Sequence, residues 1–234
     1  LFYLSKFEGS EILLIDPEPL VIENVNRHLL GFDSVGISKV KGISRYLKLS
    51  NPFIDVLERE VSIVEVIQNE LDLINDLDFL FCAIGKDAIE NYILELLSTK
   101  TITKPVIFFW VEPFLLGGHV LYIVPVTGFK LADLEESAFY INNVINKKEY
   151  DDPKKQLLLR EAGCQGSYIP YGKESIAHFF SKLLPELNLI LKERPTKSFS
   201  LTFIGNLEIA DEKGIEISDS AKNYASYELI KKEI

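Results

Sequence analysis

An acid, an amide and two cations follow one another near the start of the sequence. Asp16 ends the apolar run of residues 12–15, and Asn24, Arg27 and Lys39 come after it. An acid at the end of a buried parallel strand is well placed to hydrogen-bond ribose hydroxyls. Arginine and lysine donate charge-assisted hydrogen bonds to phosphate oxygens. The stretch therefore suits a nucleoside triphosphate, although a solvated turn followed by a helix would have the same spacing.

The sequence contains two cysteines, Cys82 and Cys164, which excludes a disulfide framework and the paired CxxC spacing of a structural zinc site. Cys164 lies between glycines 163 and 166, where the backbone can approach a binding partner closely. A nucleophilic thiolate needs a lowered pKa, which Arg160 would provide if the segment is helical. The alternative for Cys164 is a buried thiol in a glycine-rich turn. Cys82 lies in an apolar run and is predicted to be a core residue.

Other side chains are weaker candidates for chemistry. Glu112 ends an apolar run, where α/β sheets place groups that contact ligands, so it could meet a substrate. His119 follows Gly117 and Gly118 and is expected to satisfy a local hydrogen bond. Four more residues are candidates for capping, packing or contacting a ligand: His28, His178, Tyr168 and Tyr171.

Composition limits the class of protein. A chain of 234 residues, 47% hydrophobic and 26% charged, suits one large soluble domain or one domain with an insertion. The net charge of -10 argues against a nonspecific nucleic-acid binder, because that affinity depends on clustered cations. Since no apolar run approaches the roughly 18 residues of a membrane span, we expect a cytoplasmic protein with no membrane partner. Methionine is absent, even at position 1, so we expect a truncated sequence or one without its methionines.

Strand-like and helix-like patterns alternate along the chain and predict a doubly wound α/β sheet. Residues 79–84 and 106–111 are continuously apolar, as is typical of central strands covered on both faces. Further strands are predicted at residues 11–15, 54–61, 119–126, 198–204 and 207–217. Helices are predicted at residues 35–47, 63–71, 88–97 and 175–191.

The string D-P-E-P-L-V-I-E-N-V-N-R-H-L-L-G from Asp16, followed by D-S-V-G-I-S-K-V and N-P, resembles the ThiF/MoeB/HesA family of ubiquitin-activating-enzyme relatives. The likeness covers about residues 5–125. That family binds ATP and adenylates the C-terminal carboxylate of a ubiquitin-like protein, commonly as a homodimer. The resemblance implies that Asp16 holds the ribose and that Asn24, Arg27 and Lys39 bind the triphosphate.

Two later strings resemble a narrower branch. W-V-E-P with G-G-H, and R-E-A-G-C-Q-G-S-Y-I-P-Y-G, are similar to ThiF-type activating enzymes of bacterial ubiquitin-like conjugation and antiphage defence. In that branch a cysteine of the crossover loop accepts the activated carbonyl as a thioester and passes it to a conjugating enzyme, so the resemblance assigns this role to Cys164. It also implies a Rossmann-like sheet with mixed C-terminal strands, divided into an ATP-binding core (1–128), a crossover segment (129–174) and a helix with strands that complete the same domain (175–234).

The chain departs from the family pattern in two places. The glycine-rich phosphate-binding turn would precede Leu1 and is outside the sequence. The resemblance expects a magnesium-binding aspartate just after residues 79–84, but strict alignment puts Gly85 there, so Asp87 is the predicted Mg²⁺ ligand.

Three hypotheses follow from these residues. The first is an ATP-dependent activating enzyme for a ubiquitin-like protein, with thioester transfer through Cys164. The second is a noncatalytic subunit of the same fold that binds a partner or scaffolds a dimer. The third, a nicotinamide-dependent oxidoreductase, accounts for Asp16 but leaves Asn24, Arg27 and Lys39 unexplained.

Overall fold

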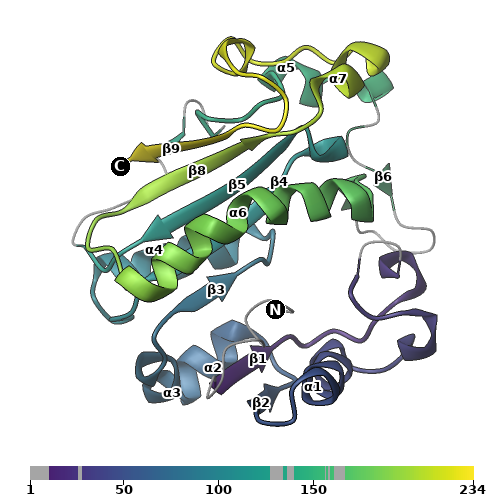
Figure 1. Ribbon diagram of the computed structural model, residues 1–234. Coiled ribbons are helices and arrows are strands. Elements are labelled where there is room, and N and C mark those ends of the chain that lie inside the picture. Colours follow the sequence, from purple (N-terminus) through teal and green to yellow (C-terminus); the bar gives the residue numbers. More distant parts are fainter. Residues whose placement is uncertain are drawn as a thin grey trace. The chain divides into compact units, whose positions relative to one another are not determined.

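The computed structural model describes residues 11–25, 28–126, 134–135, 140–155, 157, 159–160 and 167–234 (Figure 1). The chain forms two compact units, residues 1–74 and residues 75–234. The predicted division into a core (1–128), a crossover segment (129–174) and a C-terminal part (175–234) stays a prediction.

In the first unit, a helix connects two parallel strands. β1 (Glu11–Ile15) pairs with β2 (Asp55–Arg59), with Ile15 opposite Arg59, and α1 (Lys39–Ser50) lies between them in sequence. Helix α1 buries Val40 and Leu47 in a cluster that includes Leu14 of β1. A helical crossover between parallel strands is the building block of a doubly wound fold. The shorter elements of this unit are η2 (Ile22–Asn24), η3 (Phe32–Ser34) and α2 (Ile63–Asn69), and α3 (Leu71–Asp76) spans the boundary.

The second unit is built on a mixed sheet in the order β3-β4-β5-β8-β9. Its strands are β3 (Leu80–Cys82), β4 (Val106–Val111), β5 (Gly117–Ile123), β8 (Phe199–Ile204) and β9 (Leu229–Glu233). β3 and β4 are parallel, whereas β4 with β5, β5 with β8 and β8 with β9 are antiparallel. The predicted fold class, α/β with mixed C-terminal strands, is confirmed.

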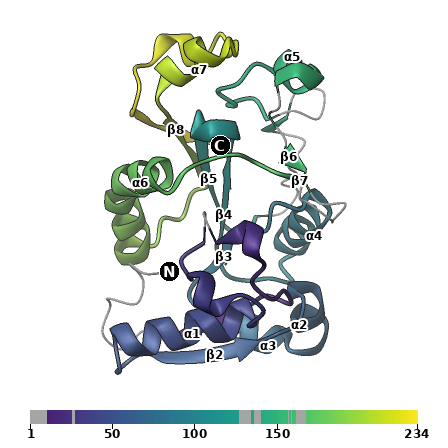
Figure 2. The same cartoon turned by 90° about the vertical axis from the view of Figure 1, so that its right-hand side faces the viewer.

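Helices cover both faces of this sheet. Figure 2 shows α6 (Lys173–Glu193) on one face and α4 (Asp87–Ser98) on the other. The buried side of α6, including Phe179, Leu183 and Leu187, packs against inward residues of β4, β5 and β8. The central strands β3 and β4 are continuously apolar, as expected where both faces of a sheet are covered.

The remaining elements follow β5 or join the strands. η4 (Pro113–Leu115) links β4 to β5. α5 (Lys147–Tyr150), η6 (Pro153–Lys155), β6 (Leu159–Arg160) and β7 (Ser167–Tyr168) precede α6, and α7 (Leu207–Lys213) and η7 (Ala221–Asn223) join β8 to β9. A second apolar cluster, with Leu116, Val144 and Ile204 among its buried members, holds these connections to the sheet.

Two sequence-based predictions of secondary structure are wrong. Residues 207–217, predicted as a strand, begin with α7, because the Asn206 side chain accepts a hydrogen bond from Glu208 N at 3.2 Å and caps the helix. Gly214 ends the helix with φ of 60°. Residues 63–71, predicted as one helix, fall in α2 and the start of α3, with Glu70 between them.

Candidate functional site

The structure brings Asp16 and Lys39 together. The Asp16 backbone N–H donates to Arg59 O at 3.2 Å, so Asp16 stands at the carboxyl end of the β1–β2 pair. Lys39 is the first residue of α1, and its Nζ lies 3.7 Å from Asp16 Oδ2 and 2.7 Å from Glu18 Oε2. The Lys39 side chain is only 12% exposed. The predicted acid and one of the predicted cations therefore share one small site.

Backbone pairing within the loop returns Lys39 to Asp16. Leu20 exchanges hydrogen bonds with the far side of the loop, donating to Ile37 O at 2.8 Å and accepting from Gly36 N at 2.8 Å. Lys39 N donates to Glu18 O at 3.1 Å. Gly36 has φ of 84°, a conformation that side chains other than glycine rarely adopt. A turn that requires Gly36 thus closes the loop between Asp16 and Lys39.

The ammonium group of Lys39 already has two acidic partners. It contacts the carboxylates of Asp16 and Glu18. Because an ammonium group has three donors, a phosphate group could bond to Lys39 beside these contacts or in place of Glu18. Asp16 has another fixed contact, since its Oδ1 accepts from Glu18 N at 2.8 Å.

The other predicted triphosphate ligands are only partly described. Asn24 ends η2, and its carbonyl oxygen accepts from His28 N at 2.8 Å. Arg27 lies outside the described residues, so its role stays a prediction. His28 Nδ1 accepts from Leu30 N at 3.1 Å, which is a local bond within the turn, while Gly31 is the N-cap of η3.

Asp87 is exposed at the first position of α4, in the second unit. Gly85 before it has φ of 64°, and its N–H donates to Glu90 Oε1 at 2.9 Å. Burial raises the pKa of Glu90 most, and the nearby Asp87 charge raises it further. Within the described residues, no group of three or more His, Cys, Asp or Glu side chains could hold a metal ion. Mg²⁺ is often held by one or two carboxylates together with substrate phosphates, and the role of Asp87 as its ligand stays a prediction.

Glu112 is a buried anchor. Among the described residues, four groups donate to its carboxylate, which is 2% exposed: His119 Nε2 at 2.7 Å, Val144 N at 2.6 Å, Ile145 N at 2.7 Å and Tyr150 OH at 3.3 Å. Burial of this kind is incompatible with the predicted contact between Glu112 and a substrate. The prediction that His119 satisfies a local hydrogen bond is confirmed.

Aromatic rings enclose the histidine of this pair. The His119 side chain is fully buried, with its ring 5.1 Å from the Trp110 ring and 5.2 Å from the Tyr140 ring. Burial raises the pKa of Tyr150, and the Glu112 charge adds to that effect. The W-V-E-P and G-G-H strings thus describe one buried cluster in which a carboxylate is surrounded by donors.

Cys164 lies outside the described residues, but the strands on either side of it are described. β6 and β7 pair antiparallel, with Leu159 opposite Tyr168 and Arg160 opposite Ser167. Arg160 itself is in β6 rather than in a helix, and its effect on Cys164 stays a prediction. Cys82 is buried in β3, and burial raises the pKa of its thiol, as expected of a core residue.

Two more candidate side chains have ordinary surroundings. The His178 ring lies 5.3 Å from the Tyr227 ring. Tyr171 packs against the apolar cluster beneath α6, which is the commoner use of an aromatic residue. Nothing in these contacts indicates chemistry.

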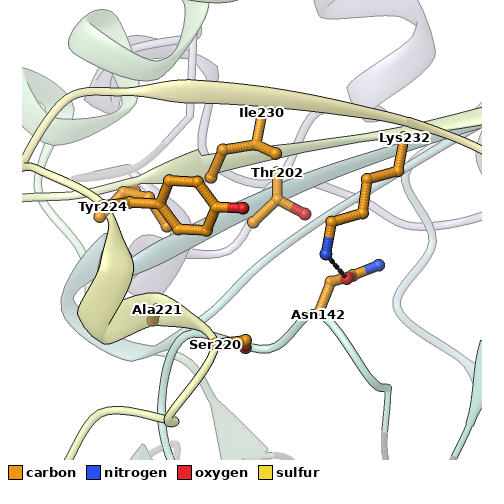
Figure 3. Close-up of a pocket in the computed structure, with 8 residues that line it drawn as sticks. Asn142, Thr202, Ser220, Ala221, Tyr224, Ile230 and Lys232 are labelled. Atoms are coloured by element: carbon orange, nitrogen blue, oxygen red, sulfur yellow. Dashed lines mark hydrogen bonds between the residues drawn. The ribbon is translucent and has the colours of Figure 1, made fainter.

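A small pocket opens on the sheet face opposite α6. Figure 3 shows Lys232 directed toward Asn142, whose Oδ1 accepts from Lys232 Nζ at 2.8 Å. Thr202 and Tyr224 line the same space. Its enclosed volume is about 10 Å³, which is enough for one water molecule. A nucleotide or a peptide tail does not fit there.

Comparison with solved structures identifies the fold. The crystal structure of PaaA aligns over 96% of this chain and 56% of that chain, with a TM-score of 0.55 and 13% identity. The two chains share a fold. E. coli MccB solved with ATP aligns over 54% of this chain and 36% of that chain, with a TM-score of 0.42 and 20% identity.

Comparison with curated proteins gives a distant relative. The chain is 23% identical over 171 residues to the ATP-dependent ubiquitin transferase-like protein Cap2 of Pseudomonas aeruginosa. The match covers 73% of this chain but only 29% of Cap2. At this low identity, the relative and the PaaA fold support the superfamily that the sequence resembles. No family model matches the sequence. None of the helices in the described residues is long and apolar enough to cross a bilayer.

Proposed function

We propose that this chain is the ATP-binding part of an enzyme that adenylates the C-terminal carboxylate of a ubiquitin-like protein. The observation that carries the proposal is the closed loop that holds Lys39 Nζ 3.7 Å from Asp16 Oδ2 at the carboxyl end of parallel strands. An acid there suits ribose, and a largely buried lysine beside it suits phosphate. The relative Cap2, named as an ATP-dependent ubiquitin transferase-like protein, supports the same substrate class.

The chemistry requires charge stabilisation more than a nucleophile from the protein. The substrate carboxylate attacks the α-phosphorus of ATP, a mixed anhydride with AMP forms, and pyrophosphate leaves. Asp16 would bind the ribose, while Asn24, Arg27 and Lys39 would bind the triphosphate oxygens, which carry the negative charge. Asp87 would ligate Mg²⁺, which neutralises phosphate charge when bound.

The thiol step is the second part of the proposal. Cys164 as a thiolate would attack the carbonyl of the mixed anhydride, form a thioester and release AMP. A conjugating enzyme would then take the acyl group from Cys164. This step rests on the resemblance of the sequence around Cys164, and the homodimer expected of the family rests on the same ground.

Pyrophosphate exchange tests the adenylation step. ATP, labelled pyrophosphate and a ubiquitin-like protein tail are incubated with the chain and with Lys39→Ala. We expect exchange to fall about 100- to 1000-fold in Lys39→Ala, as for loss of one charge-stabilising donor. Lys41→Ala is the matched control, because Lys41 lies in the same helix but is exposed and pairs with Glu60 at 2.6 Å. Equal rates in Lys39→Ala and Lys41→Ala would exclude the proposed role of Lys39.

One observation favours the noncatalytic alternative. Gly85 occupies the position where the resemblance expects a magnesium-binding aspartate, and its φ of 64° is strained for a residue with a side chain. The turn after β3 is therefore built for glycine. If ATP binds with no exchange for any tail, the chain is a nucleotide-binding subunit without adenylating activity.

A further inference from the structure

The buried carboxylate of Glu112 holds backbone rather than substrate. Its Oε1 accepts from Val144 N at 2.6 Å and its Oε2 from Ile145 N at 2.7 Å. These bonds join the end of β4 to a segment more than thirty residues later, as the separations of 32 and 33 positions show. Hydrogen bonds to a charged group are stronger than those between neutral groups. Glu112 is therefore a strong attachment point for residues 144–145.

The turn that presents Glu112 is fixed in shape. Phe114 and Leu115, directly after Glu112 and Pro113, have φ of 57° and 52°. Such residues persist only where their surroundings hold them in place. A Cβ on Gly205 would lie 1.9 Å from Leu115 O, so Gly205 allows the chain to pack against this turn.

The same turn holds a second, distant segment. Phe114 N donates to Pro170 O at 2.5 Å. The chain between residues 145 and 170 includes β6, β7 and Cys164. The β4–β5 turn thus contacts the backbone on both sides of the segment that carries Cys164, at Val144 and Ile145 before it and at Pro170 after it.

The first attachment is reinforced from another direction. Ile145 forms an antiparallel bridge with Ile217, Asn146 N donates to Glu216 O at 2.9 Å, and Ser218 N donates to Val144 O at 2.7 Å. Residues 144–146 therefore lie between the Glu112 carboxylate and residues 216–218. Two independent sets of hydrogen bonds therefore fix the position of residues 144–146.

We propose that Glu112 is a positioning residue, which together with the β4–β5 turn fixes both ends of the segment that carries Cys164. The segment that carries the thiol is then attached on both sides, at Val144 and Ile145 before it and at Pro170 after it. The proposal rests on the proposed function for the role of Cys164, but the attachment itself does not. A misplacement of about 1 Å at a reacting group can slow a reaction about 100-fold.

The test uses Glu112→Gln in the full chain, because the amide NH₂ cannot accept from a backbone N–H. We expect pyrophosphate exchange within about twofold of wild type, single-turnover thioester formation about 10- to 100-fold slower, and faster amide hydrogen exchange at Val144 and Ile145. Tyr150→Phe is the matched control, because it removes the longest bond to Glu112, 3.3 Å, and keeps both backbone attachments. It should leave all three readouts near wild type. Unchanged thioester formation alongside faster amide exchange would overturn the positioning role.

A second readout separates this proposal from the proposed function. If wild type forms no thioester, the thiol step of the proposed function fails, and alkylation of Cys164 by iodoacetamide decides about Glu112. We expect the alkylation rate to change at least about threefold in Glu112→Gln and not in Tyr150→Phe. Equal rates in all forms would overturn the proposal. Glu112→Asp, which keeps the charge but is shorter, should give intermediate values and replaces Glu112→Gln if that variant does not fold.

Discussion

Substituting Gly117 by alanine tests the packing around Glu112. Gly117 begins β5, and a Cβ there would lie 2.0 Å from Glu112 Oε1 and 2.7 Å from its Cδ. Since both distances are far below any ordinary contact between heavy atoms, the Glu112 carboxylate must move. Oε1 would then lose its bonds to His119 Nε2, at 2.7 Å, and Val144 N, at 2.6 Å.

Gly117→Ala should lower the free energy of unfolding, although the intrinsic preference of a strand for alanine over glycine would raise it. Loss of two hydrogen bonds to a charged group costs about 3–6 kcal/mol. Alanine in a strand is otherwise favoured over glycine by about 0.5–1 kcal/mol. The free energy of unfolding should therefore fall by about 2–5 kcal/mol, and Tm by about 5–15 °C for a protein of this size.

Urea and thermal unfolding measure this change. Gly172→Ala is the control, because nothing lies within 4 Å of the place where its added methyl group would sit. Its φ of -99° is ordinary, and as the N-cap of α6 it should lose only about 1 kcal/mol on changing to alanine. In a Glu112→Ala background the clash partner is gone, so Gly117→Ala should cost less than about 1 kcal/mol there. A Gly117→Ala variant as stable as wild type, or one with equal losses in both backgrounds, would refute the reasoning.

Three further predictions concern other parts of the chain. Asn206→Ala should lower the free energy of unfolding by about 1 kcal/mol, measured in urea, because α7 loses its cap; an unchanged value would show that the cap does not contribute. Arg59 hydrogen-bonds Glu70 and holds the pKa of Glu70 below its usual 4.5. The pair therefore stabilises the fold above pH 4.5, and this contribution is lost as the pH falls. In Arg59→Gln the titration midpoint of Glu70, followed by NMR, should rise toward 4.5. Cys82 should resist alkylation at pH 8 in the folded protein and react in urea, as peptide mapping by mass spectrometry would reveal, because burial raises its thiol pKa.

The sequence predicts elements whose signals are local. β4 has its predicted bounds, residues 106–111, because a continuous apolar run is enough to specify a central strand. For α7 the spacing of Leu207 and Ile209 favours a strand, and the capping signals of Asn206 and Gly214 outweigh that spacing in the fold. β9 ends in Lys231, Lys232 and Glu233, and such a charged strand gives no alternation to detect.

The candidate sites also differ in how far the sequence predicts them. Asp16 and Lys39 could be assigned to one site from their residue types, their spacing and the family resemblance, and the structure closes the loop between them with a turn at Gly36. The anchoring role of Glu112 could not, because two of its partners are backbone N–H groups of Val144 and Ile145, and a backbone group carries no residue-type signal. The one available signal was the G-G-H string, since Gly117 makes room for the Glu112 carboxylate.

The position of β9 has a consequence for aggregation. β8 is buried along its whole length, with the sequence F-S-L-T-F-I, and β9 pairs with its outer edge. An unpaired strand of this composition is a template for pairing with another chain. β9 covers that edge. Its lysines make β9 itself a poor template, because charge disfavours the addition of a further strand. Proteolysis between η7 and β9 would therefore convert a guarded edge into a site of self-association.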